Sequence, residues 1–526
     1  MASAVLLALP CLQLKLFWLA WFALVPWLLL LAQSPQPRVA FWWSWLVGFL
    51  FFLGSGWWLI HVTVVGWLLM SAYLALYFGG FGYLVTATHD TRHTTHDKTA
   101  LVMGHESWVM GRLFVIPAFW VVLEYARSHL LSGFGWNLLG YSQTPWLRLI
   151  QFADVTGVWG VSFLIVLVNA AIAEMISGPL WVSRHRQGHR RAPPRGSAQW
   201  VVVLVAFAVT MGYSALRSAQ VMVKVSEVQP VRVAVVQGNI PQEQKWDEAF
   251  VERISQRYES LTAEAAATHP DLIVWPETSV PGYFGGDEEL TQRMLRVAKH
   301  TQLPLLVGAP VLVRGEHWLT LRNSAVLLSA AGDILDRYDK LHLVPFGEFI
   351  PGERTFPWLR RVLPPIGDFT PGDRYTVFNS QFEIRNSKFP FSTLICFEDI
   401  FPSLARRFVR DGARMLVVIT NDAWFGPTAA AYQHAQASTF RAVELRVPVV
   451  RAANTGWSGC IDATGRWIGS VHDASGRELF VEGTRACEIR QGPANSAYLR
   501  FGDWFAFVCI AITLATFWYN RRSLHA

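Results

Sequence analysis

Long runs of apolar residues, separated by short polar segments, fill the first 216 positions of the chain. A helix that crosses a bilayer needs roughly 17 to 25 predominantly apolar residues. The pattern predicts a transmembrane helical bundle over residues 1–218 and, over 499–526, a last transmembrane helix with a cytoplasmic tail. The apolar runs lie at about 11–32, 40–60, 62–87, 112–131, 150–176 and 199–216, with a shorter one at 503–519.

The opening stretch MASAVLLALP is apolar but too short to cross a membrane. It also lacks the basic residues with which a cleaved signal peptide begins. We expect it to be the remnant of one more helix, either shortened here or lost to a late start codon, rather than a cleaved signal peptide.

A different pattern fills residues 219–498, where short β-rich runs bounded by Gly, Pro or polar residues alternate with helical segments. This alternation predicts an α/β domain with buried sheets. The expected strands are 231–240, 271–278, 303–311, 324–330, 391–399 and 413–422, and the expected helices are 247–268, 286–301 and 402–411.

The distribution of positive charge predicts the topology, because Lys and Arg are retained on the cytoplasmic side of short loops. Five arginines lie in RHRQGHRRAPPR, residues 184–195, which places that loop in the cytoplasm. The helix at 199–216 then leads outward, so the 219–498 domain is expected to be extracytoplasmic. Arg521 and Arg522 return the C-terminal tail to the cytoplasm and agree with this orientation.

Composition excludes several classes of function. Only 16% of residues are charged, against about 25% in an ordinary soluble domain, and 52% are hydrophobic. The net charge of +7 is not arranged as a basic face with interleaved aromatics, so no nucleic-acid partner is expected. The five cysteines show no metal-ligand spacing, so we expect no metal site, no cofactor and no disulfide framework.

Three reactive side chains follow predicted strands or turns: Glu277 in WPET, Lys340 in YDKLHLVPFGE and Cys396 in ICFED. Catalytic groups gather at the carboxyl ends of strands in α/β sheets. Taken singly, the cysteine is explained as a small core residue and the two charges as solvated. Taken together, they supply a thiol, a base to ionise it and a cation for an oxyanion, which predicts nucleophilic catalysis by cysteine.

These three segments resemble the signature motifs of the nitrilase, or carbon–nitrogen hydrolase, superfamily. A closer resemblance, over nearly the whole chain, is to the apolipoprotein N-acyltransferase family, carried also by QGNIPQEQKW, HLVPFGEFIP, TNDAWFG and GFGWNLLGYSQ. It implies a transmembrane helical bundle, a periplasmic nitrilase-like α-β-β-α sandwich and a final helix, in the bacterial inner membrane and as a monomer.

The resemblance implies a role for each reactive residue. Cys396 is the nucleophile that takes an acyl chain from a glycerophospholipid as a thioester, Glu277 is the general base, and Lys340 stabilises the oxyanion. The acceptor would be the α-amine of the S-diacylglyceryl cysteine of an apolipoprotein. The reacting groups of both substrates lie near the surface of the membrane lipid, which explains why the site is tethered to a bundle.

Other positions match the family around this site. Glu348 and Glu398 match further acids expected to orient the lysine and shape the site, and Trp246 matches a tryptophan near the acyl or substrate path. Phe397 departs from the family, which commonly has Tyr there. Asn421, Asp422 and Trp424 of TNDAWFG are expected to line the mouth of the site, with ordinary turn chemistry as the alternative.

Three further features have open interpretations. Glu124 and Arg127 lie three apart in an apolar helix and are expected to pair, either as a structural tie or to bind a lipid headgroup. His89, His93, His96 and His105 are read as belonging to a solvated loop rather than a metal site. The Pro- and Gly-rich segment 342–371 is expected to form a mobile lid beside the site.

Two alternatives to acyl transfer remain open at this stage. A membrane-tethered amidase or nitrilase would resolve the thioester with water, and the three reactive residues do not separate it from a transferase. A non-catalytic lipoprotein-binding or scaffold protein would have no reason to retain all three. The resemblance of the membrane segments favours transfer.

Overall fold

The computed structural model describes residues 1–34, 36–88, 100–185, 197–314, 319–353, 355–358, 360, 367–378, 383–384 and 387–525. The chain divides into two compact units: Met1–Ser218 with Arg500–Ala526, here the helical unit, and Ala219–Leu499, here the sandwich unit. The predicted histidine loop, residues 89–96, and most of the arginine-rich loop, residues 186–195, lie outside the described residues. The side chain of His105 does as well.

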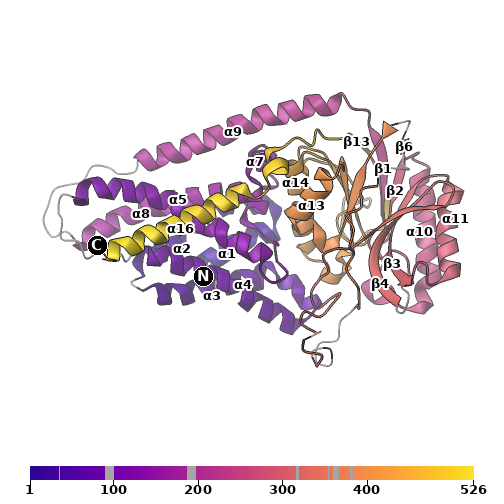
Figure 1. Ribbon diagram of the computed structural model, residues 1–526, viewed down its shortest axis with the longest axis horizontal. Helices are drawn as coiled ribbons and strands as arrows, with labels where there is room; N and C mark the ends of the chain where they lie inside the picture. Colours follow the sequence, from indigo (N-terminus) through magenta and orange to yellow (C-terminus); the bar gives the residue numbers. More distant parts are fainter. Residues whose placement is uncertain are drawn as a thin grey trace. The chain divides into compact units, whose positions relative to one another are not determined.

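Helices build the whole of the helical unit, and α16 packs against α5 (Figure 1). Five segments in the described part of the chain are long and apolar enough to cross a membrane: Leu14–Gln33, Pro37–Ser55, Val64–Ala87, Val158–Ser177 and Gln199–Ser226. The long helices are α3 (Pro37–Ser55), α4 (Val64–Ala87), α5 (Ala100–His129), α8 (Val158–His185), α9 (Ser197–Ser226) and α16 (Trp504–His525). The predicted crossings at 112–131 and 503–519 fall on α5 and α16 and stay predictions.

The run at 11–32 does not form the single continuous helix that its composition predicted. It is divided among the end of α1 (Ala2–Leu12), the 3₁₀ helix η1 (Leu14–Trp21) and α2 (Val25–Gln33). Pro26 lacks a backbone N–H and therefore favours the start of a new helix. The break is satisfied from α8, where Asn169 accepts a 2.9 Å hydrogen bond from the Leu24 N–H. Buried backbone groups at such a break need partners of this kind.

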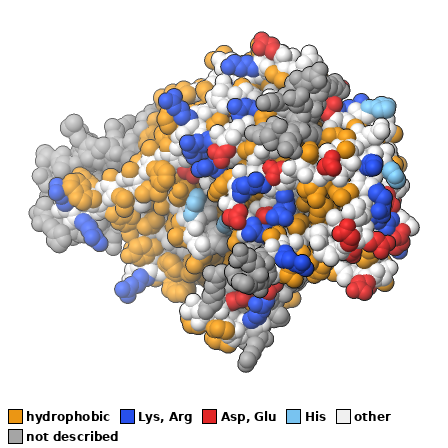
Figure 2. All heavy atoms as spheres, turned by 45° about the vertical axis from the view of Figure 1, so that its right-hand side comes forward, with side chains coloured by type: hydrophobic (Ala, Val, Ile, Leu, Met, Phe, Trp, Pro, Cys, Tyr) orange, Lys and Arg blue, Asp and Glu red, His pale blue; other side chains and the backbone are white. Residues whose placement is uncertain are grey.

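Hydrophobic side chains cover much of the helical unit, whereas lysines, arginines and acidic side chains gather over the sandwich unit (Figure 2). Inside the helical unit, the indole of Trp27 on α2 stacks on Phe78 of α4, with ring centroids 5.4 Å apart. A surface that is apolar around the helices is typical of a protein embedded in lipid.

The described strands of the sandwich unit form two main sheets. The larger sheet has the order β13-β1-β2-β3-β4-β5, and the smaller one has the order β12-β11-β10-β9-β8. In the larger sheet the strands are β1 (Val231–Gln237), β2 (Leu272–Val274), β3 (Leu305–Arg314), β4 (Leu319–Leu328), β5 (Ile334–Asp339) and β13 (Gly483–Ile489). In the smaller sheet they are β8 (Phe391–Ile395), β9 (Met415–Thr420), β10 (Val449–Ala453), β11 (Gly459–Ile461) and β12 (Trp467–Ser470).

Successive side chains of β1 point into two different hydrophobic cores, and this shows how the sheets are layered. Val233 and Val235 join the core that contains the smaller sheet, while Ala234 and Val236 join the core under α10 (Val251–Ala266) and α11 (Glu288–Thr301). On the other side, α13 (Pro402–Arg410) and α14 (Ala430–Leu445) cover the smaller sheet (Figure 1). Helix, sheet, sheet and helix stack in that order, so the predicted α-β-β-α sandwich is confirmed.

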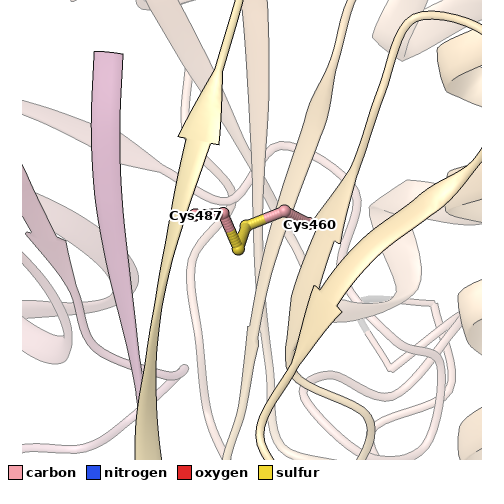
Figure 3. Close-up of a disulfide and its surroundings, with 2 residues drawn as sticks. All are labelled: Cys460 and Cys487. Carbon is pink, nitrogen blue, oxygen red and sulfur yellow. A yellow bond between two sulfur atoms is a disulfide. The ribbon is translucent and has the colours of Figure 1, made fainter. Parts of the chain in front are cut away.

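A disulfide joins the two sheets. Cys460 on β11 and Cys487 on β13 are bonded across the space between the sheets (Figure 3). The expectation that the chain forms no disulfide is therefore wrong. The two residues are 27 positions apart and lie in different sheets, so only the tertiary fold brings them together.

Candidate active site

Glu277 lies just beyond β2, where the chain leaves the larger sheet. Its backbone is pressed against β3, because a Cβ at Gly308 would lie 2.1 Å from the Pro276 carbonyl oxygen. The next residue, Thr278, has a φ of 46°, a conformation that side chains other than glycine adopt at a cost. The carboxylate is buried and accepts a 2.9 Å hydrogen bond from the Asn421 N–H of the smaller sheet.

Lys340 follows β5 at the same end of the larger sheet and is fully buried. Its Nζ lies 2.9 Å from Oε2 of Glu348 and 3.5 Å from Oε1 of Glu277. Burial alone would lower the pKa of this ammonium group, but the two carboxylates outweigh burial and hold its pKa above the ordinary value. Lys340 therefore stays charged, as a group that stabilises an oxyanion must.

Cys396 is the first residue after β8 and has a φ of 53°, so the chain turns sharply where the thiol emerges. The side chain is only 9% exposed. Burial and the Glu277 charge raise the pKa of the thiol above its ordinary value, and Lys340 offsets only part of that rise. At neutral pH the thiol is protonated, so a nucleophilic reaction here requires a base.

Glu398 links the segment that carries Lys340 to the turn at Cys396. Its Oε1 accepts hydrogen bonds from the Tyr338 hydroxyl and from the N–H groups of Leu341 and His342, at 2.7, 2.7 and 3.0 Å. Its Oε2 accepts a 2.7 Å bond from the Ile395 N–H, one residue before the thiol. Burial raises the pKa of this carboxyl to about 7, although the backbone N–H groups oppose the rise.

Sequence reasoning missed Asn323, which joins the two acids beside Lys340. Its amide nitrogen donates to Oε1 of Glu277 and to Oε1 of Glu348, both at 2.8 Å. Asn323 lies within β4, and the signal was its position as a polar residue directly before the apolar run 324–328. A side-chain amide can donate to two carboxylates, so Asn323 keeps these acids apart in fixed positions.

Sequence reasoning also missed a buried network of charged and polar side chains that reaches the backbone of Cys396. Nε2 of His434, on α14, lies 3.1 Å from the Cys396 carbonyl oxygen, and its Nδ1 lies 3.0 Å from Asp422. Arg451, on β10, lies between Asp422 and Asp399, with 3.2 Å contacts to both. Buried charges are tolerated when they are paired in this way. The contact between His434 and the Cys396 carbonyl oxygen holds the turn at Cys396 in place.

Lys245 was also missed. It lies beside Trp246 at the end of the QGNIPQEQKW segment, and only 3% of it is exposed. Its Nζ donates a 3.0 Å hydrogen bond to the carbonyl oxygen of Glu277. A charged residue next to a matched tryptophan gave no sequence signal that it would be buried.

The other predicted residues lie at different depths. Asn421 is buried, and its side chain donates to Gln242 at 2.7 Å. Trp424 is partly exposed on the 3₁₀ helix η8 (Asp422–Phe425), and Trp246 is 48% exposed. Phe397 packs its ring on Phe401, with centroids 5.1 Å apart.

The predicted lid segment is described only in part, because residues 354, 359 and 361–366 lie outside the described residues. Within the rest, Phe346, Phe356 and Trp358 expose more than half of their side chains. Its mobility remains a prediction.

Glu124 and Arg127, in the helical unit, are both buried. Each bonds to the backbone of the loop after α5. Arg127 Nη1 donates to the carbonyl oxygens of Phe134 and Trp136, at 2.9 and 2.7 Å, and Glu124 accepts a 2.7 Å bond from the Leu139 N–H. Their pairing with each other stays a prediction.

In the described part of the chain, no group of three or more His, Cys, Asp or Glu side chains could hold a metal ion. The charged groups of the site are instead paired with one another or with N–H donors. Acid–base and nucleophilic chemistry is what such an arrangement can perform.

A buried cysteine, glutamate and lysine at the strand ends of an α-β-β-α sandwich define a protein of the carbon–nitrogen hydrolase, or nitrilase, class. Residues 232–480 match the family model described as carbon-nitrogen hydrolase. Residues 3–171 match the model described as apolipoprotein N-acyltransferase N-terminal domain. The chain belongs to the apolipoprotein N-acyltransferase family.

Curated relatives that are similar over most or nearly all of this chain support this assignment. An apolipoprotein N-acyltransferase of Geobacter metallireducens is 38% identical, over 99% of this chain and 95% of its own. One of Chlorobaculum tepidum is 31% identical, over 85% and 82% of the two chains. Among solved structures, an amidase from Nesterenkonia sp. is similar at a TM-score of 0.36 and 17% identity, covering 52% of this chain and 92% of its own.

Proposed function

We propose that this chain is a membrane N-acyltransferase that moves an acyl chain from a glycerophospholipid to the α-amine of the S-diacylglyceryl cysteine of apolipoproteins, acting as a monomer. Membership of the family supports the reaction class. One observation of the site supports the residue assignment: Glu277, Lys340 and Cys396 are all buried at strand ends, with Lys340 Nζ 3.5 Å from Glu277 Oε1 and the Glu277 carboxylate held by the Asn421 N–H of the smaller sheet. These three residues are the proposed catalytic set.

The first half-reaction forms the acyl-enzyme. Glu277 takes the proton of the Cys396 thiol as sulfur attacks the ester carbonyl carbon of the phospholipid. Lys340 stabilises the negative charge that develops on the carbonyl oxygen. When the tetrahedral adduct collapses, the carbon–oxygen ester bond breaks and Glu277 returns the proton to the departing alkoxide. The products are a thioester and a lysophospholipid.

The second half-reaction transfers the acyl group. The apolipoprotein α-amine attacks the thioester carbonyl, and Glu277 accepts the proton that the amine loses. The carbon–sulfur bond then breaks, and the thiolate regains that proton, leaving an amide. Burial of Cys396 supports transfer over hydrolysis, because it limits the access of water to the thioester.

The remaining predicted residues are proposed to support these steps. Glu348 fixes the ammonium group of Lys340, and Glu398 fixes the segments before Lys340 and Cys396. Asn421 holds Glu277 through its backbone N–H. Trp246 and Trp424 line the substrate path. Phe397 retains the ring packing but not the hydroxyl of the usual tyrosine.

We also propose that the protein lies in the bacterial inner membrane, with residues 219–498 in the periplasm. The Cys460–Cys487 disulfide supports this side of the membrane, because disulfides persist in oxidising compartments such as the periplasm. The arginine-rich loop at 184–195 supports the same orientation.

The test is intact mass spectrometry of the purified protein after incubation with phospholipid alone. Wild type is expected to gain one acyl chain that hydroxylamine removes, Cys396→Ala to gain none, and Glu277→Gln to gain it at least about 100-fold more slowly. Cys509→Ala, which removes a cysteine of the helical unit, is the control and is expected to match wild type.

Adding a diacylglyceryl peptide to the acylated protein then tests transfer. Acyl transfer to the peptide amine is the expected result. Release of free fatty acid at the same rate with and without the peptide would contradict the proposal and favour a hydrolase.

A further inference from the structure

Lys245 is a second buried lysine beside the reacting groups, and the mechanism above gives it no role. It lies at the end of the segment that leaves β1, directly after the 3₁₀ helix η5 (Gln242–Gln244). Only 3% of it is exposed. Lysine is almost never buried to this degree unless its amine has a partner.

The partner of Lys245 is the backbone of the proposed general base. Its Nζ donates a 3.0 Å hydrogen bond to the carbonyl oxygen of Glu277. That carbonyl lies in the peptide bond to Thr278, whose φ of 46° is left-handed. An unfavourable backbone conformation of this kind persists only where its surroundings hold it, and Lys245 contributes one such contact.

The segment that carries Lys245 is itself fixed to the smaller sheet. Asn454 accepts a 2.9 Å hydrogen bond from the Ile240 N–H, and Asn421 donates one of 2.7 Å to the side chain of Gln242. The Asn421 N–H also donates to the Glu277 carboxylate, so Asn421 contacts both this segment and the proposed general base. Lys245 adds a second contact between this segment and Glu277, through the Glu277 carbonyl oxygen.

We propose that Lys245 is a positioning residue of the acyl-transfer site, which fixes the peptide carbonyl of Glu277 and adds a positive charge near the Glu277 carboxylate and the Cys396 thiol. This inference rests on the proposed function. The charge favours the thiolate and the tetrahedral oxyanion, while the hydrogen bond keeps Glu277 aimed at the thiol. A displacement of about 1 Å at a reacting group can cost 10²-fold in rate.

The protonation behaviour of Lys245 supports this role. Burial lowers the pKa of Lys245 to about 7, and the nearby Glu277 and Cys396 oppose that fall. Lys340 and Glu348 are the next charged groups, through their contacts with Glu277 and with each other. Lys245 therefore changes charge near neutral pH, whereas Lys340 does not.

The experiment measures the rate of acyl-enzyme formation from phospholipid in detergent micelles, from pH 5.5 to 9, for wild type, Lys245→Met, Lys245→Arg and the exposed control Lys299→Met. Lys245→Met is expected to acylate about 10- to 100-fold more slowly with less than threefold change in KM, and Lys245→Arg is expected to recover at least tenfold of that loss. Lys299→Met should match wild type. Acylation of Lys245→Met within threefold of wild type, or no recovery by arginine, would overturn the inference.

A second readout decides the matter if Lys245→Met fails to fold. The pH profile of wild-type acylation is expected to contain a transition near pH 7 that is smaller in Lys245→Arg, because arginine does not titrate there. The part that remains in Lys245→Arg is assigned to Glu398, whose pKa is also about 7. The same transition in both proteins overturns the inference. Absence of any acyl-enzyme in folded wild type would instead overturn the proposed function itself.

Discussion

The ammonium group of Lys340 lies 2.9 Å from Oε2 of Glu348, closer than the 3.5 Å that separates it from Oε1 of Glu277. Both acids are also held by the amide of Asn323. The position of the Lys340 ammonium group is therefore fixed by two carboxylates, and Glu348 is the closer of the two.

Replacing Glu348 should show how much the position of Lys340 depends on it. In Glu348→Gln the ammonium group of Lys340 loses its closer carboxylate partner, so it is expected to shift toward Glu277 and away from the position that stabilises the oxyanion. We expect acyl-enzyme formation to slow about 10- to 100-fold while phospholipid KM changes little. Rapid-quench mass spectrometry measures this rate. Glu289→Gln, an exposed position on α11, is the control, and equal rates in the two variants would contradict the assignment.

Glu398 provides a prediction on stability and pH. Because burial raises its pKa to about 7 in the folded protein, against 4.5 for an ordinary glutamate, the folded state binds its proton more tightly. This contribution to stability is present in full below about pH 4.5 and is lost as pH rises through about 7. Thermal melting of the wild-type protein across this range should therefore show a fall that Glu398→Gln lacks.

The same variant should also be less stable above pH 7. Both carboxylate oxygens of Glu398 accept bonds from N–H groups, so the amide nitrogen of glutamine must face a donor. We expect a loss of about 1–3 kcal/mol in the free energy of unfolding. A variant as stable as wild type at pH 8 would show that these hydrogen bonds contribute nothing.

The residue pattern predicted an α/β domain with buried sheets and the three reactive residues for a physical reason, whereas the α-β-β-α arrangement was implied only by the family resemblance. Strands such as β8 and β9 are continuous apolar runs, and the reactive groups follow strands, where sheet geometry concentrates chemistry. Lys245, Asn323 and His434 could not be found in this way. Their importance depends on which polar groups meet across the two sheets, and that information lies in tertiary contacts rather than in periodicity.

The later strands were missed for a related reason. β11 and β12 are short and contain glycine, and α14 is buried along its whole length although its sequence is rich in polar residues. Neither pattern has a clear period of two or of 3.6 residues. The disulfide was missed as well, because the two strands that carry its cysteines were both absent from the predicted fold.

Loss of that disulfide should destabilise the sandwich unit. The bond closes a loop of 27 residues, for which the chain-entropy model gives about 3.5 kcal/mol. We expect Cys460→Ala with Cys487→Ala to melt at a lower temperature than wild type in detergent. Reductant should lower the melting temperature of wild type toward that of the double variant and leave the double variant unchanged. Cys509→Ala is the control, and a double variant that melts with wild type would contradict the prediction.

The two alternatives for Arg127 can be separated by one variant. Arg127 donates to the carbonyl oxygens of Phe134 and Trp136, so its charge is used within the helical unit. In Arg127→Met these carbonyls lose their partner, at a cost of about 1–3 kcal/mol each. We expect a lower melting temperature, with phospholipid KM for the folded fraction within threefold of wild type. Glu124→Gln should be milder, because glutamine can still accept from the Leu139 N–H. A KM raised tenfold or more at an unchanged melting temperature would instead assign Arg127 to a lipid headgroup.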